Sequence, residues 1–369
     1  MKWNSVVKKL LSVMLMLCLF LPAVAMAGLE DDTYHSFYSI IDCEKSLSNK
    51  LYKTFRQAGE LSIVIPGCPQ DFVPQGLAYY APKNLIFFSG YSSDKNASTL
   101  ISANPATGEI VKEIFLKNPD GSWYTGHAGG VSVTDKNIFI SDKNKLYRLP
   151  MSAYEAAEFS DVGTFVEAIP VPCEASYCQL NNGILWVGEF YHDDKKDEKD
   201  YLTDPSHEVK GPDGTTYYSW ILGYKLVNYT ENELDPACIT ANGAIPDYVL
   251  ITPIHIQGLT FSGGKIFLSQ SYGRANDSTI YRYGNVLGTD PHMKVQVLGV
   301  PRPAWFLNAA VQESKLISPP MSEGLCTIGD SVYISFESAA TKYREPKKKD
   351  EDPSRDPLDR LFKLNPYGF

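Results

Sequence analysis

One sequence pattern occurs five times along this chain of 369 residues and constrains its fold more than any other feature. Each copy has a strand-like segment, a short turn, and a second apolar segment that ends on Ser or Gly; a third strand-like segment follows. The five copies are PQGLAYYAPKNLIFFSGY, HAGGVSVTDKNIFISD, SYCQLNNGILWVGEF, IQGLTFSGGKIFLSQ and SEGLCTIGDSVYISFE. Alternating apolar residues bounded by turn residues are typical of antiparallel sheets. Five similar sheet units predict an all-β fold, a five-bladed β-propeller.

The ends of the chain indicate how the propeller closes. The last copy lacks an outer strand, whereas ELSIVIPG at 60–67 has the pattern of a strand without a partner of its own. We expect this segment to complete the last blade, because closure removes free sheet edges. The blades of a single domain, residues 60–369, are expected near 75–117, 127–172, 176–252, 257–300 and 323–369. MKVQVLGV (293–300) is the expected outer strand of the fourth blade, and residues 28–59 are expected to form an arm with a short helical portion.

The N-terminus predicts export. Three lysines precede an apolar run that ends in Ala25-Met26-Ala27, which is the pattern of a signal peptide over residues 1–27. A membrane anchor is the alternative, but the run is short for a span and Pro22 interrupts it. We therefore expect cleavage before Gly28 and a secreted or periplasmic mature chain without a membrane span.

The cysteines bear on the same compartment. Of the seven cysteines, Cys18 lies in the leader, and an even number left in an exported chain predicts disulfides. The favoured pairs are Cys43–Cys68, joining the arm to the barrel, and Cys173–Cys178, closing a short loop. Cys178 also occupies an inner-strand position that is apolar in other copies, so a plain buried thiol is the alternative there.

Charge narrows the class of partner. The formal net charge is −9, and no basic patch with interleaved aromatic residues occurs. Nucleic acid is therefore not an expected partner. The expected partners are a small molecule, a peptide or a glycan, bound by a monomer.

The aligned copies predict a site at one mouth of the central channel. Carboxylates, amides and aromatic rings in such a narrow place favour a small-ligand pocket, although the polar groups alternatively only bond one another. Two charged insertions, 192–217 and 342–359, are expected to flank this mouth. The residues placed there by the alignment are Gln75, Gly129, Ser176, Gln257 and Glu323 before the inner strands, Tyr91, Asp142, Glu189, Gln270 and Glu337 at or after the second strands, and Trp123, Tyr124, His127 and His255 in the entering loops.

Glu323 is the one acid among the five residues that precede the inner strands. Partial removal from water raises the pKa of a carboxyl group and suits it to proton transfer. Glu323 is therefore the candidate general acid or base.

Two blades resemble the plant and bacterial glutaminyl cyclotransferases. That family has a blade opening on Gln-Gly-Leu and continuing with Ser, Tyr-Gly-Arg and Ser, followed by a blade opening on Glu-Gly-Leu. Here the corresponding elements are 257–259, Ser269, 272–274 and Ser278, then 323–325. The resemblance implies cyclisation of an N-terminal glutamine, with Glu323 as proton shuttle and Arg274 supporting the loop.

A looser resemblance is to the gluconolactonase- and regucalcin-like propellers, which also open a blade on Glu-Gly. That family holds a divalent ion on the axis. The resemblance implies calcium as a cofactor, with Glu323, Glu189 and Asp142 as oxygen ligands.

Two classes of function therefore stay open at this point. The favoured interpretation is an exported propeller that binds a small ligand or peptide at the channel mouth. The alternative is an enzyme, either a cyclotransferase with a Glu acid/base or a metal-assisted lactonase-like hydrolase. The fold does not decide between them, because propellers host both.

Overall fold

The computed structural model describes residues 39–192, 203–346 and 352–369, which lie in one compact unit. The expected signal peptide and parts of both charged insertions lie outside these residues. Within the described ranges, no helix is long and apolar enough to cross a membrane.

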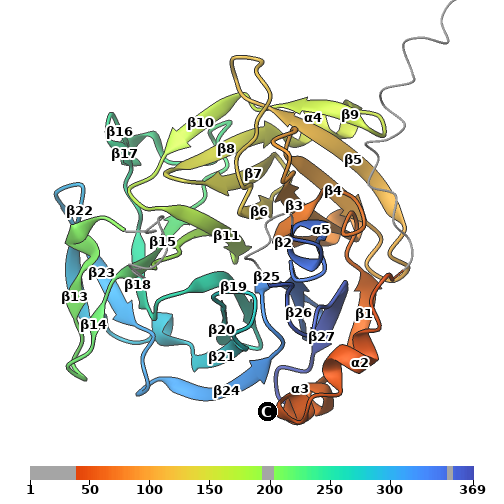
Figure 1. Cartoon of the computed structure of the whole chain (residues 1–369). Coiled ribbons are helices and arrows are strands. Elements are labelled where there is room, and N and C mark those ends of the chain that lie inside the picture. Colours follow the sequence, from red (N-terminus) through yellow and green to blue (C-terminus); the bar gives the residue numbers. More distant parts are fainter. Residues whose placement is uncertain (1–38, 193–202, 347–351) are drawn as a thin grey trace, which may run out of the picture. The chain divides into compact units, whose positions relative to one another are not determined.

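A ring of five inner strands forms the centre of this unit, and each inner strand begins one antiparallel sheet (Figure 1). Neighbouring inner strands contact each other all the way round, and the last contacts the first. They are β2 (Val73–Tyr80), β6 (Gly130–Val133), β11 (Ala175–Asn181), β19 (Ile256–Ser262) and β25 (Ser322–Ile328).

Three further strands complete each blade, so the predicted five-bladed propeller is confirmed. The second strands are β3 (Leu85–Tyr91), β7 (Asn137–Asp142), β12 (Ile184–Glu189), β20 (Lys265–Gln270) and β26 (Ser331–Phe336). The third strands are β4 (Thr99–Ala103), β8 (Lys145–Pro150), β15 (Ser219–Lys225), β21 (Ser278–Gly284) and β27 (Arg360–Leu364). The fourth strands are β5 (Ile110–Lys117), β10 (Glu167–Pro170), β18 (Tyr248–Thr252), β24 (Gln312–Ser318) and β1 (Gly59–Val64). Short elements in the connections are η2 (Ala81–Lys83), α4 (Met151–Ala156), η3 (Pro205–His207), β13 (Val209–Lys210), β14 (Thr216–Tyr217), η4 (Pro236–Cys238), β16 (Ile239–Thr240), β17 (Gly243–Ala244), η5 (Val286–Gly288) and α5 (Thr341–Arg344).

The propeller closes through its N-terminal strand, as predicted. β1 pairs antiparallel with β27, so the last blade combines strands from both ends of the chain. The helical arm is also confirmed, as α2 (Cys43–Leu47), η1 (Lys50–Tyr52) and α3 (Lys53–Gln57). Phe55 of α3 stacks on Phe362 of β27 with ring centroids 3.8 Å apart. The arm therefore packs on the blade that its own following strand completes.

A buried carboxylate ties the start of the arm to that blade. Asp359 accepts hydrogen bonds from the backbone N–H groups of Ile40 (2.6 Å) and Ile41 (3.1 Å) and from the Ser39 hydroxyl (2.6 Å). Carboxylates that accept several bonds of this kind hold a chain segment firmly.

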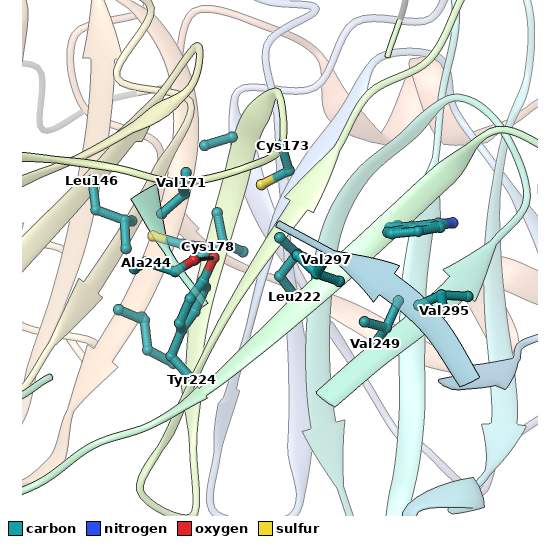
Figure 2. Packing of buried hydrophobic residues seen from close by; sticks show 14 of the residues in the cluster. Leu146, Val171, Cys173, Cys178, Leu222, Tyr224, Ala244, Val249, Val295 and Val297 are labelled. Atoms are coloured by element: carbon teal, nitrogen blue, oxygen red, sulfur yellow. Dashed lines mark hydrogen bonds between the residues drawn. The ribbon is translucent and has the colours of Figure 1, made fainter. Parts of the chain in front are cut away.

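The expected outer strand of the fourth blade was assigned wrongly. β22 (Met293–Val297) forms a hairpin with β23 (Val300–Phe306), and β23 runs parallel to β18 at the edge of the third blade. The fourth blade instead ends with β24, which pairs with β21. Val295 and Val297 of β22 belong to the apolar cluster between the second and third blades (Figure 2). Alternation predicts a strand but does not say which sheet edge it covers.

The predicted disulfides are not found in the structure, where the six cysteines in the described ranges are free thiols. The Cys43 thiol donates to Oδ1 of Asp359 at 3.2 Å. Cys173 and Cys178 lie in the apolar cluster between the second and third blades (Figure 2). Burial raises the pKa of the Cys178 thiol to about 11, which keeps it protonated. The alternative of a plain buried thiol is the correct one for Cys178.

The inner strands approach each other so closely that glycine is required at the contact. A Cβ on Gly130 would meet the backbone nitrogen of Cys178 on the next inner strand. A Cβ on Gly258 would lie 2.6 Å from the carbonyl oxygen of Glu323, and one on Gly324 would lie 2.7 Å from the backbone nitrogen of Leu77. Backbone thus packs against backbone around the axis.

In the third blade the close contact involves a different pair of residues. Tyr177 stands where the other copies have glycine, and it pairs with Gly188 across the hairpin. In the other copies a glycine is opposite a serine, as Gly130 is opposite Ser141. A Cβ on Gly188 would meet the Tyr177 ring, so the exchange of Ser for Gly makes room for that ring.

We predict that Gly130→Ala destabilises the fold by about 1–3 kcal/mol, because the added methyl group overpacks backbone that has little freedom to shift. Gly288→Ala is the matched control, since its Cβ would have no atom within 4 Å. The control should change the free energy of unfolding by less than about 0.5 kcal/mol. Urea unfolding measures both, and equal midpoints for the two variants would contradict the close-contact account.

Candidate functional site

A cavity of about 440 Å³ opens at one end of the channel, and all five blades contribute to it. Its lining comes from the starts of the inner strands and from the loops beside them. The lining residues are Gln75, Tyr91, Thr125, Gly126, His127, Gly129, Asp142, Lys143, Glu174, Ser176, Phe190, His192, Gln257, Tyr272, Glu337 and Tyr343.

The predicted ring before the inner strands forms the floor, with one difference. Gln75, Gly129, Ser176 and Gln257 line the cavity. Glu323 lies beneath the floor with 2% of its surface exposed, and it accepts a hydrogen bond from Nε2 of Gln257 at 3.1 Å.

Glu337 is the buried carboxyl that faces the cavity. It directly follows β26, has 8% of its surface exposed, and accepts a bond from Nε2 of Gln75 at 2.8 Å. It is also in hydrogen-bond contact with Glu323 on the adjacent β25. The β25–β26 hairpin of the fifth blade therefore carries a carboxyl pair that accepts hydrogen bonds from both adjacent blades, the first through Gln75 and the fourth through Gln257.

The carboxyl pair holds protons more tightly than ordinary carboxyls do. Burial, followed by the charge and hydrogen bond of Glu337, raises the pKa of Glu323 well above its usual value. Burial raises the pKa of Glu337 to about 7, and the positive charge of Lys342 opposes the increase. Two acids this close share protons as one coupled unit. The pair therefore keeps at least one proton at neutral pH.

One aromatic wall lies beside Glu337 and depends on α5. Tyr343 of α5 is hydrogen-bonded to Glu337, and its hydroxyl lies 3.1 Å from that of Tyr91. Nζ of Lys342 donates to the hydroxyls of Tyr91 (2.5 Å) and Tyr343 (3.3 Å). The His127 ring stacks on Tyr91 with centroids 4.7 Å apart. This wall brings together the entering loop of the second blade and the insertion of the fifth.

A second aromatic wall comes from the third and fourth blades. Nε2 of His192 lies 2.9 Å from the Tyr272 hydroxyl, and the Tyr272 ring stacks on His255 at 4.7 Å. Phe190 packs on His255 with ring centroids 5.7 Å apart. Phe190, His192 and Tyr272 face the cavity, whereas the predicted His255 supports them from behind. Phe190 and His192 were missed, although they follow a second strand just as Tyr91 ends one.

Glu189, a predicted cavity residue, instead anchors the insertion of the third blade. It is fully buried and accepts bonds from Nδ1 of His207 (2.9 Å), the backbone N–H of Trp220 (2.8 Å) and that of Glu174 (3.2 Å). The His207 ring stacks on Trp220 at 3.9 Å. These contacts hold the insertion and the segment that carries Glu174, while Glu189 itself lies outside the cavity lining.

Other predicted residues also lie outside the lining. Gln270 donates to the carbonyl of Ile254 at 2.8 Å. Trp123 is 51% exposed, under the ammonium group of Lys117. Tyr124 is buried and hydrogen-bonded to Asp142, which does line the cavity.

Arg274 lies outside the cavity lining, against a residue that belongs to it. Its guanidinium lies 5.1 Å from the ring centroid of Tyr343 and donates to the carbonyl of Asp352 at 3.2 Å. Arg274 therefore contacts the insertion of the fifth blade at Tyr343 and Asp352, and the supporting role that the sequence resemblance implies stays a prediction.

The three candidate metal ligands do not come together. Among the residues that the structure describes, no three His, Cys, Asp or Glu side chains form a group able to hold a metal ion. Glu323 and Glu189 are engaged as above, and Asp142 accepts the backbone N–H of His127 at 3.3 Å. A calcium site built from Glu323, Glu189 and Asp142 is thus not present.

Comparison with known proteins gives structural neighbours only. No family model and no curated protein matches the sequence. A glutaminyl cyclase of Myxococcus xanthus is 10% identical over 80% of this chain and 90% of its own, with a TM-score of 0.39. A calcium-binding regucalcin of Agrobacterium tumefaciens is 12% identical over 79% and 89%, with a TM-score of 0.37. A GH43_1 enzyme of Xanthomonas citri, solved with xylose, is 10% identical over 84% and 91%, with a TM-score of 0.43.

All three TM-scores are below 0.5, so these likenesses carry no argument about the family or the function of this chain. The assignment as a five-bladed propeller depends on the strand pairing itself.

We predict that the stability of the protein falls as pH rises from about 5 to 8. The folded carboxyl pair keeps protons that the unfolded chain releases near its ordinary pKa of 4.5. Stability supplied by a raised carboxyl pKa is complete below the unfolded pKa and is lost as pH passes the folded one, here on the order of 1–3 kcal/mol.

Glu323→Gln together with Glu337→Gln should flatten this pH dependence, because the two amides stay neutral throughout. Glu109→Gln, at an exposed carboxyl, is the control and should leave the slope unchanged. Urea unfolding at pH 5, 6, 7 and 8 measures the slope, and an equally steep wild-type-like slope in the double variant would rule out the pair as its source.

Proposed function

We propose that the protein binds a small ligand in the axial cavity, with the Glu337 carboxyl as the central polar contact. The observation that carries this proposal is a buried carboxyl facing a cavity of about 440 Å³. Ligand pockets have volumes of roughly 300–1,000 Å³ and combine aromatic walls with a few converging polar groups. The cavity has this composition.

The cost of burying the carboxyl pair supports a functional role. A carboxyl group taken out of water destabilises a protein unless partners compensate it. Gln75 and Gln257 each supply one amide donor, so the pair is supported on both sides. Apolar residues would fill this place without that cost, which favours a role for the carboxyls in contact with a ligand.

The size of the cavity limits how a larger partner would bind. A peptide or glycan would enter with one terminal group, because about 440 Å³ holds only a small molecule or one residue. Export, the monomeric state and the exclusion of nucleic acid stay predictions from the sequence.

Acid–base catalysis is the second candidate function, favoured by the raised pKa of Glu337. A group with a pKa of about 7 both accepts and donates protons near neutral pH. In this scheme Glu337, whose pKa is raised by burial, touches the substrate, and Glu323 beneath it shares its proton. Cyclisation of N-terminal glutamine and lactone hydrolysis are the first reactions to test.

The test is a thermal melting screen of the mature protein against N-terminal glutamine peptides, lactones, neutral monosaccharides and small amines. A ligand at 100 times its Kd stabilises the fold by about 2.7 kcal/mol and raises the Tm. We expect at least one class to do so, and we expect Glu337→Gln to weaken its binding by roughly 10-fold or more.

Glu109→Gln again serves as the control and should bind like the wild type. A screen without any shift, or full binding by Glu337→Gln, would contradict the proposal. Turnover of a shifting ligand, with a rate that follows an ionisation near pH 7 and is lost in Glu337→Gln, would select the catalytic candidate.

A further inference from the structure

We infer that the ligand is a compact organic cation, such as an alkylammonium compound. This inference rests on the proposed binding function and names the chemical class of its ligand. Three features of the cavity lead to it: an excess of acidic groups, two aromatic walls, and an ammonium group that the protein itself places against one of them.

Acidic groups outnumber basic ones in and beneath the cavity. Asp142, Glu174 and Glu337 are in the lining, and Lys143 is the one lysine there. Partial burial, then the charges of Glu189 and Asp142, raises the pKa of Glu174. The carboxylates on this side therefore repel one another more than Lys143 compensates. A bound cation would relieve the repulsion, whereas an anion would increase it.

The aromatic walls favour a cation with apolar substituents. Six rings line the cavity: Tyr91, His127, Phe190, His192, Tyr272 and Tyr343. The face of an aromatic ring attracts cations, and ammonium groups bearing alkyl substituents bind well among several rings beside a carboxylate. Inorganic cations such as calcium instead require six to eight oxygen ligands, and the described residues lack even a group of three carboxylate, thiolate or imidazole ligands.

The Lys342 ammonium already occupies one such environment. Its Nζ lies 4.7 Å from the ring centroid of Tyr91 and 4.8 Å from that of Tyr343. Its charge stabilises the ionised form of Glu337. The wall beside Glu337 is thus compatible with an alkylammonium group. The second aromatic wall, formed by Phe190, His192 and Tyr272, also presents rings to the cavity, and Glu174 is part of the same lining.

The decisive comparison uses choline and its uncharged isostere 3,3-dimethyl-1-butanol, which has the same shape without the positive charge. Calorimetric titration at pH 7.5 and constant ionic strength gives both affinities. We expect choline to bind at least 10-fold more tightly than the isostere. Methylammonium extends the series to a smaller cation.

Glu174→Gln is the informative variant, because Glu174 lines the cavity but, unlike the buried Glu337, is an exposed residue. We expect it to weaken choline binding several-fold and to leave binding of the isostere unchanged. Glu109→Gln, at another exposed carboxyl that is not part of the lining, should affect neither.

The outcomes separate this inference from the function on which it rests. Equal affinity for choline and the isostere, or binding of neutral sugars or peptides in place of both cations, would overturn the cationic class and leave ligand binding standing. Absence of binding across every class, in protein that melts cooperatively, would overturn the binding function as well.

Discussion

Backbone contact between neighbouring inner strands is the constraint on which this propeller depends. Gly130, Gly258 and Gly324 let each strand approach the next more closely than any side chain would permit. The contact fixes the radius of the ring and hence the position of every blade that continues outward from it. In the third blade Tyr177 and Gly188 stand where the other copies have Gly and Ser. The larger side chain on one strand is thus matched by a glycine on its partner, so the fit is kept although the residues differ.

The same contact positions the site, because the residue before each of these inner-strand positions is forced to the end of the channel. Gln75, Gln257 and Glu323 reach the axis in this way. Hydrogen bonds from Gln75 to Glu337 and from Gln257 to Glu323 then fix these side chains around the carboxyl pair. Glu323 lies deepest, and Glu337, whose pKa is raised by burial, is the member of the pair that faces the cavity. A pair of acids with one member exposed to the cavity combines strong proton retention with access.

The repeated pattern contained enough information to predict the blades, the closure by β1 and four of the five floor residues, since these follow from local alternation and from the need to remove sheet edges. It did not contain the edge that β22 covers, because an alternating strand fits more than one sheet. The cysteine count likewise indicated disulfides, whereas packing placed Cys43 against Asp359 and Cys178 among apolar side chains. Counting residues does not give distances.

The residues that sequence alignment missed share a physical cause. Phe190, His192 and Tyr343 lie in segments that begin where the repeated pattern stops, Tyr343 on the short helix α5, and long-range contacts fix their positions. Tyr343 is held by Glu337 below it and Arg274 beside it, and His192 by Tyr272 of the next blade. The floor of the cavity is thus set by the repeat, while its walls combine residues that the repeat predicts, such as Tyr91 and His127, with His192 and Tyr343 of the insertions. A change of ligand class would therefore require changes in the wall residues while the glycine ring stays the same.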